Sequence, residues 1–436
     1  MLKKIKLSSF FKTTSKTTLV KASGMAVGVL VSIFIGRLLG AEGLGIINLS
    51  NQLAGILTML VLLGLPTVIL KETAIAVSNK NWAHINNVIF TSLKINLPLA
   101  ALVILFSYLI IPFVTKKIFE PSLEIPLTII TIAVIFQVLS RILASGLNGY
   151  NKIWQSSLVG DTLSIILVGL FILFQFILNW PTTVISIALS YALARLVVSV
   201  SITLYWKKVH VLKDKPIKEF IPKSLLRVGL PLLFVQATNT IAGNIDSIMI
   251  GSFLSVKEVG LYAVAFKIAF VSSFFLQVTN AVLAPKIASL FAENKVKDLE
   301  KTIQKVTTNL TLIGLGGLVV IILVAPYALK LWGDVFTAAY IPLIILSVGQ
   351  FFNISAGCVG LALSMCGQQK ILGRITLFTA ILNTILNFSL IQIWGLTGAA
   401  ISTSLTLIAG NALGIYFNKT KLNITFISLK IYKLKL

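Results

Sequence analysis

Acidic and metal-binding side chains are scarce in this sequence. Its 436 residues include 13 Asp and Glu, 2 His and 2 Cys, against 37 Lys and Arg. Cys358 and Cys366 lie close together in an apolar stretch, a setting that favours helix packing over a disulfide or a metal site. No carboxylate pair, His cluster or Ser–His arrangement occurs at a spacing that catalysis could use. We therefore expect no metal, no cofactor and no enzymatic activity.

Apolar residues dominate instead. They make up 57% of the chain, charged residues only 11%, and the mean hydropathy is +0.97. A soluble domain cannot bury so large an apolar fraction, whereas runs of about 20 apolar residues are typical of membrane-spanning helices. We predict an all-α polytopic membrane protein with twelve spans, at about 17–39, 46–70, 88–114, 125–147, 155–178, 183–206, 226–252, 259–284, 306–329, 338–364, 372–393 and 397–417. The first of these is expected to stay as a span, because it lacks a convincing signal-peptide cleavage site.

The sequence also repeats itself at about half its length. The stretch Ser32–Leu53 breaks at a Gly-rich corner, Gly40–Gly43, and then resumes as an apolar run. A similar stretch, Ser247–Ile268, follows 215 positions later, and weaker matches follow in the same order. The pattern predicts a duplicated protein, with a six-helix bundle at 1–206, a cytoplasmic linker at 207–223, a second six-helix bundle at 224–417 and a basic cytoplasmic tail at 418–436.

The basic residues behind the net charge of +24 predict the orientation. Loops on one side of the predicted spans carry most of the Lys and Arg, whereas those on the other side hold only Lys116, Lys117, Lys257 and Lys330. By the positive-inside rule, both termini and the linker are cytoplasmic. No soluble domain gathers these charges onto one face, so we expect no nucleic-acid partner. Membrane lipids are the expected partner of the basic tail.

Two amphipathic stretches precede predicted spans. Val296, Leu299 and Ile303 are spaced for one helical face, and Trp82 and Ile85 form a similar pattern earlier in the chain. We predict that each stretch forms an elbow helix in the plane of the membrane.

Ionisable residues inside the predicted spans are the most informative feature. Seven are basic, and a charge at the centre of a membrane helix costs about 2.5–3.5 kcal/mol on insertion scales, so lipid exposure of all seven is disfavoured. Lys21 and Arg227 are close enough to an interface to reach water by snorkelling. The others predict an aqueous cavity between the halves, with a cationic substrate-binding surface formed by Arg37, Lys94, Arg141, Arg195 and Lys267.

Two acids, Asp161 and Asp246, also lie within predicted spans. Asp246 and Lys267 fall at a similar predicted depth, so an ion pair is one reading and an ion-coupling site the other. Asp161 could likewise pair with Arg141 across a short turn.

The run GMAVGVLVSIFIGRLLGAEGLGIINLSNQLAGILTMLVLLGLPTVILKE, together with SIMIGSFLSVKEVGLYAVAFKIAF, resembles Wzx-type polysaccharide flippases. These belong to the multidrug/oligosaccharidyl-lipid/polysaccharide exporter superfamily, which includes the MATE transporters. The resemblance implies two six-helix bundles around a central cavity that opens alternately to each side. It implies a bacterial inner-membrane protein that moves an undecaprenyl-pyrophosphate-linked oligosaccharide, a repeat unit of O-antigen of lipopolysaccharide, capsule or exopolysaccharide. It also implies, as partners, the polymerase and ligase of the same pathway.

Two other functions remain open. A MATE-like exporter of a small molecule fits the fold, and the excess of basic residues then favours anionic cargo. A membrane glycosyltransferase or polymerase of the same pathway fits less well, because the predicted external loops are short and carry no acidic motif.

Overall fold

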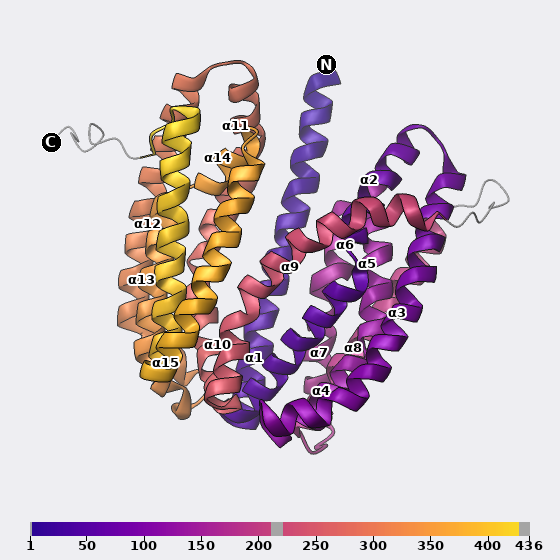
Figure 1. The fold of residues 1–436 in the computed structure, drawn as a ribbon, viewed down its shortest axis with the longest axis vertical. Coiled ribbons are helices and arrows are strands. Elements are labelled where there is room, and N and C mark those ends of the chain that lie inside the picture. The colour runs from indigo at the N-terminus through magenta and orange to yellow at the C-terminus, as the bar shows by residue number, and fades with distance from the viewer. Residues whose placement is uncertain (1, 211–220, 427–436) are drawn as a thin grey trace. The chain divides into compact units, whose positions relative to one another are not determined.

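Helices form all the regular structure in the part of the chain that a computed structural model describes, residues 2–210 and 221–426. The side chains of residues 1–15 and of Asp161 are outside this description, as are most of the predicted linker and the end of the predicted tail. The helices, including short 3-10 and π segments (η), are α1 (Leu2–Leu62), α2 (Leu65–Ser78), α3 (Trp82–Lys117), η1 (Pro121–Leu123), α4 (Glu124–Ile132), α5 (Val134–Gly149), α6 (Ile153–Ser157), η2 (Leu158–Thr162), α7 (Leu163–Ile177), α8 (Val184–Val209), α9 (Pro222–Phe253), α10 (Val256–Val271), α11 (Ser273–Ala292), α12 (Val296–Lys330), η3 (Asp334–Ala339), α13 (Tyr340–Ala356), α14 (Val359–Met365) and α15 (Gln369–Leu422) (Figure 1).

The protein is an all-helical, multi-pass membrane protein. Nine helical segments within the described ranges are long and apolar enough to cross a membrane, and a bent pair that includes α7 would make ten. Large apolar side chains point outward along them; Leu109, Leu323 and Ile393 are each more than 65% exposed. A water-facing surface would not carry so many exposed apolar side chains, whereas lipid accommodates them.

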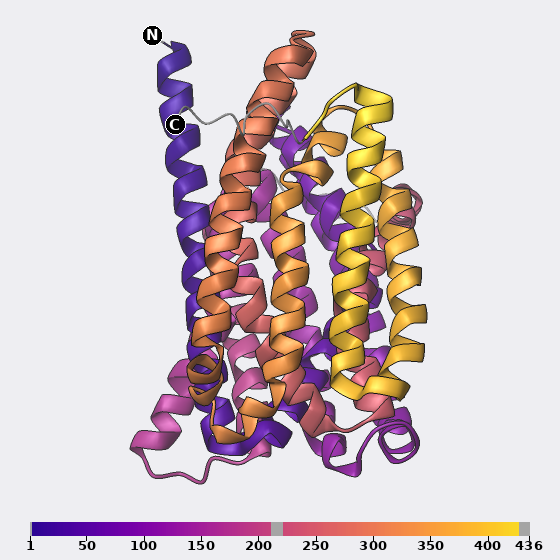
Figure 2. The same ribbon diagram turned by 90° about the vertical axis from the view of Figure 1, so that its left-hand side faces the viewer.

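The two longest helices each break at a glycine. In α1 the break is at Gly40 (φ 69°, ψ −168°), where we expected the Gly-rich corner, and in α15 it is at Gly395 (φ 56°, ψ −135°). Residues with a side chain rarely adopt these backbone angles, so glycine allows the chain to turn sharply. The repeat offset of 215 places Gly40 on Ser255, which caps α10 directly after α9 ends. Figure 2 shows the two arms of α15, in orange and yellow, lying side by side in opposite directions.

Contacts divide the chain into two compact units, Met1–Thr240 and Ile241–Leu436. In unit 1, α5 packs against α2, α3 and α8; in unit 2, α13 packs against α10, α12 and α15. The division falls within α9 rather than in the predicted linker, because the first half of α9 packs into unit 1. There, the backbone of Gly229 lies against Gly64, the N-cap residue that precedes α2 at φ 71°.

The prediction of elbow helices is wrong. α3 and α12 each run without a break from the amphipathic stretch into the apolar one. The apolar face of the α12 stretch is covered by protein: Leu299 and Ile303 are fully buried in a core cluster with Leu422 and Phe426. The same cluster contains Cys358 and Cys366, both buried, as expected for residues that pack between helices.

Candidate functional site

Unit 1 contains a cavity of about 190 Å³ that brings two of the predicted cations together. Arg141 enters it from α5 and Arg195 from α8, accompanied by Gln137, Ser140 and Tyr191. Two guanidinium groups in one small cavity repel each other, and a low dielectric strengthens that repulsion. The arrangement therefore favours occupation by an anion.

Arg195 is held by neutral groups. Its Nη2 donates to Asn51 Oδ1 at 2.7 Å and its Nη1 donates to the carbonyl of Ile130 at 3.3 Å. Asn51 is itself oriented by a bond from its Nδ2 to the carbonyl of Ile47. These contacts connect α8 to α1 and α4 and occupy two of the five N–H donors of Arg195 without cancelling its charge.

Arg141 lies beside an irregular segment. Its Nη1 is 3.8 Å from the position that a Cβ on Gly160 would occupy. Gly160 belongs to η2, a π-helical turn, and such turns occur frequently at functional sites. The next residue is Asp161, whose predicted pairing with Arg141 lies outside the described side chains.

The other predicted cations are not among the described residues lining this cavity. Arg37 and Lys94 are exposed on α1 and α3, and the Nζ of Lys94 lies 5.7 Å from the centre of the Phe90 ring. Lys267 is half-buried on α10 in unit 2. Their role in substrate binding stays a prediction.

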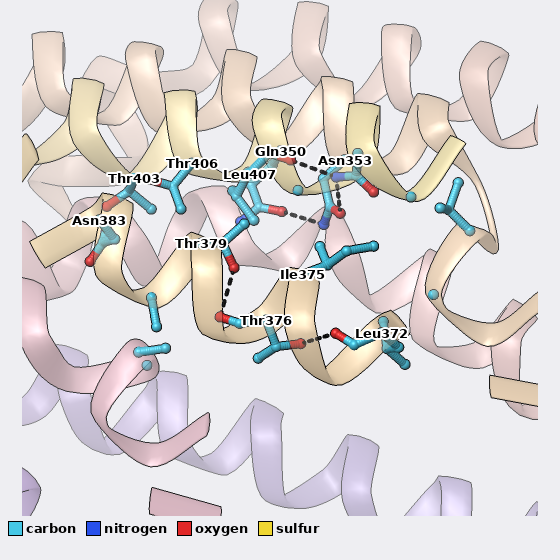
Figure 3. Close-up of a pocket in the computed structure, with 18 of the residues that line it drawn as sticks. Gln350, Asn353, Leu372, Ile375, Thr376, Thr379, Asn383, Thr403, Thr406 and Leu407 are labelled. Carbon is cyan, nitrogen blue, oxygen red and sulfur yellow. Dashed lines mark hydrogen bonds between the residues drawn. The ribbon is translucent and has the colours of Figure 1, made fainter. Parts of the chain in front are cut away.

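Unit 2 contains a larger cavity, of about 380 Å³, with a different lining. Its polar side chains are amides and hydroxyls from α13 and both arms of α15, with one carboxylate, Asp246, from α9. In Figure 3, Asn383 and Thr403 lie at one end of this lining and Gln350 and Asn353 toward the other. No Lys, Arg or His occurs among its described lining residues. The cavity is polar but not cationic.

Asp246 is buried and accepts three hydrogen bonds from neutral side chains. Tyr262 Oη donates to Oδ2 at 2.9 Å, Thr403 Oγ1 donates to Oδ2 at 2.6 Å, and Asn387 Nδ2 donates to Oδ1 at 2.6 Å. Three such bonds stabilise a carboxylate away from water. We had also considered Lys267 as an ion-pair partner, and that pairing stays a prediction.

Part of the second cavity was missed from the sequence. Its amides and the hydroxyls of Thr376, Thr379 and Thr406 were not among the site residues predicted from the sequence. A signal was present, because Thr376, Thr379, Asn383 and Asn387 follow helical spacing along one side of α15. Threonine also serves ordinary helix packing, so this pattern alone did not indicate a cavity.

Comparisons with known proteins agree with this architecture. Residues 10–291 match the polysaccharide biosynthesis protein family, and residues 231–389 match the MatE family. A probable low-salt glycan biosynthesis flippase, Agl15 of Haloferax volcanii, is 26% identical over 182 residues, which are 42% of this chain and 39% of the relative. The chain thus spans about two fifths of the length of this relative, and the same holds for a second probable flippase of that organism.

Two solved structures have the same fold. One is a multidrug resistance MATE family transporter of the MOP superfamily in an inward-facing conformation, with a TM-score of 0.75 and 16% identity over 93% of this chain and 98% of that one. The other is the lipid II flippase MurJ, with a TM-score of 0.71 and 14% identity over 93% of this chain and 87% of that one. At these identities the likeness concerns the fold alone.

Proposed function

The chain belongs to the polysaccharide biosynthesis protein family, a family of transporters and flippases rather than enzymes, and from this membership we propose that it flips a lipid-linked glycan across a membrane. The cargo we propose is an oligosaccharide on undecaprenyl pyrophosphate, a repeat unit of O-antigen, capsule or exopolysaccharide. Transport would proceed by alternating access. The observation that carries the proposal is that Arg141 and Arg195 both line one cavity of unit 1.

The chemistry of this pair suits a pyrophosphate group. A guanidinium presents its N–H donors in a planar fork that matches phosphate oxygens, and it stays charged at any physiological pH. An anion between two such groups relieves their mutual repulsion and replaces part of the hydration that it loses on leaving water. Arg37, Lys94 and Lys267 are proposed to contact the substrate at other stages of its passage.

We propose twelve membrane crossings for this function. The 61 residues of α1 would extend about 90 Å as one helix, three times the hydrocarbon thickness of about 30 Å. Its break at Gly40, and that of α15 at Gly395, make each of these helices two crossings. Added to the other candidate spans, they give twelve, an even number that puts both termini on the same side, which the basic loops predict to be the cytoplasmic one. The proposed location is the cytoplasmic membrane of a bacterium, with the pathway's polymerase and ligase as partners.

We also propose that Asp246 couples transport to a monovalent cation or a proton. Beside its carboxylate, the Oδ1 atom of Asn387 is buried with no hydrogen-bond partner in the described chain. An unpartnered buried oxygen next to a carboxylate is costly unless a cation or a water occupies the site. Hard cations prefer such oxygen ligands. For Asp161 we propose the ion pair with Arg141.

The fold is also compatible with export of a small anion, and one assay distinguishes the two. Full-length protein in proteoliposomes would be given a fluorescent undecaprenyl-pyrophosphate oligosaccharide, whose movement is followed by quenching from outside. We expect protein-dependent flipping that Arg141→Gln and Arg195→Lys slow at least tenfold. Arg374→Gln, which removes an exposed cation at the start of α15, should leave the rate unchanged. If the lipid stays in place while a soluble organic anion crosses, the chain is an exporter.

A further inference from the structure

The cavity in unit 2 has the composition of a carbohydrate-binding site. Its described lining contains four amides, Gln350, Asn353, Asn383 and Asn411, together with threonine hydroxyls and Asp246. Because no Lys, Arg or His occurs among the described lining residues, the cavity is poorly suited to a phosphate. Neutral sugars, by contrast, present many hydroxyl groups, each of which both donates and accepts hydrogen bonds.

The amides form a row in which each orients the next. Ser273 Oγ and Asn353 Nδ2 both donate to Gln350 Oε1, the latter at 3.2 Å, and Asn411 Nδ2 donates to Asn353 Oδ1 at 3.0 Å. These bonds use the oxygens of Gln350 and Asn353. They leave Gln350 Nε2 as a donor and Asn411 Oδ1 as an acceptor, neither of which bonds to another described residue. The row thus presents fixed polar atoms to a ligand.

The threonines opposite this row contribute acceptors. Thr376 Oγ1 donates to the carbonyl of Leu372 and Thr379 Oγ1 donates to the carbonyl of Thr376, each at 3.0 Å (Figure 3). A hydroxyl that gives its only proton to its own helix keeps its lone pairs available. Such an oxygen accepts from a sugar hydroxyl.

An aromatic surface completes the lining. Phe266 and Phe270 of α10 both line the cavity, with ring centres 5.7 Å apart and planes 16° from parallel. Flat apolar surfaces of this kind pack against the C–H face of a sugar ring. The volume of about 380 Å³ is near the lower end of the range for small-molecule pockets, about 300–1,000 Å³. It has room for a short piece of glycan.

We propose that this cavity is a sugar-binding subsite that selects the glycan, whereas the arginine cavity of unit 1 binds the phosphate. The proposal rests on the function proposed above. Asn353, Asn411 and Gln350 form its hydrogen-bonding wall, Phe266 and Phe270 its stacking wall. Selectivity for the glycan therefore depends on unit 2.

Gly243 offers a direct test. It lines the cavity, and a Cβ built on it meets no atom within 4 Å, so the Cβ of Gly243→Leu is accommodated and the rest of the side chain would take up space in the cavity. Gly316 on α12 is exposed like Gly243 and has equally free space around a Cβ, but it is not among the residues lining the cavity, which makes Gly316→Leu a matched control. Asn353→Leu removes hydrogen bonding at nearly constant volume.

The measurement is saturation-transfer NMR on purified full-length protein with methyl glycosides of glucose, galactose, mannose and N-acetylglucosamine. We expect at least one glycoside to bind, and its Kd to rise at least tenfold in Gly243→Leu and Asn353→Leu but not in Gly316→Leu. Binding of inorganic pyrophosphate should be unchanged in all three. If no glycoside binds, or if Gly243→Leu binds as well as the parent protein, the sugar subsite is wrong. Absence of lipid flipping by the parent protein in the proteoliposome assay would instead contradict the proposed function, so the two failures can be told apart.

Discussion

Arg195 on α8 donates a 2.7 Å hydrogen bond to Asn51, 144 positions earlier on the second arm of α1. The Asn51 side-chain oxygen thus accepts a hydrogen bond from a charged group that lies inside a helical bundle. It therefore has two effects: it joins two distant helices, and it fixes the direction in which the guanidinium faces the cavity.

Replacing Asn51 should therefore weaken both stability and anion binding. In Asn51→Leu the Nη2 donor loses its charged-group hydrogen bond, a loss of about 1.5–3 kcal/mol. We expect a lower Tm in detergent and weaker pyrophosphate binding. Asn48→Leu is the matched control, because among the described residues Asn48 Nδ2 bonds to the carbonyl of Leu44 in its own helix and to no other helix. Equal effects from both substitutions would show that Asn51 acts through helix packing alone.

The contact between Gly64 and Gly229 predicts a large effect of a single methyl group. A Cβ at Gly64 would lie 2.2 Å from the carbonyl oxygen of Gly229, and Gly64 has a left-handed backbone. The backbone alone costs a residue with a side chain about 1–2 kcal/mol, and the clash adds to this. Thermal unfolding of Gly64→Ala should show a marked loss of stability. Gly55→Ala, where a Cβ meets nothing, should be neutral or slightly stabilising.

The extent of sequence-based prediction can be judged from such positions. Hydropathy identified the helical membrane class, and the glycine corner at Gly40 was found because glycine permits angles that other residues avoid. The two arginines were recognised because a charge in lipid requires an explanation. That both arginines line one cavity depends on how α5 and α8 pack against each other, and the sequences of the two helices do not predict this packing. The elbow helices were wrong for a related reason: Leu299 and Ile303 mark an apolar face without saying whether lipid or protein covers it.

His210 illustrates a residue with no sequence signal at all. It directly follows α8, and its position in the sequence predicts no role, yet it is only 7% exposed. Its Nε2 bonds to Asn86 Oδ1 at 2.7 Å and its Nδ1 to Tyr150 Oη at 2.5 Å, and it stacks on Trp206. Because the amide oxygen can only accept, Nε2 carries the proton and Tyr150 donates to Nδ1. The neutral ring satisfies both bonds.

This geometry predicts a pH dependence of stability. Burial lowers the pKa of His210 below its usual value of 6.5. The unfolded chain therefore takes up the proton first as the pH falls, so the stabilisation is complete above about pH 6.5 and is lost below it, down to the pKa of the folded state. We expect the Tm of the parent protein to fall more between pH 7.5 and 5.5 than that of His210→Gln. His84→Gln, at a half-exposed histidine bonded to Glu72, should retain the fall.

Asp246 allows coupling to be separated from folding. Asp246→Asn keeps the shape of the side chain but replaces one carboxylate oxygen, an acceptor, by an NH2 group, a donor. That NH2 group would face another donor, on Tyr262, Thr403 or Asn387. We expect a loss of about 1–3 kcal/mol in stability and the loss of any dependence of flipping on a sodium or proton gradient. Asp298→Asn, at an exposed acid in the first turn of α12, should change neither. If flipping by Asp246→Asn still responds to the gradient that drives the parent protein, the carboxylate is purely structural, because an uncharged amide cannot exchange a proton or neutralise a cation.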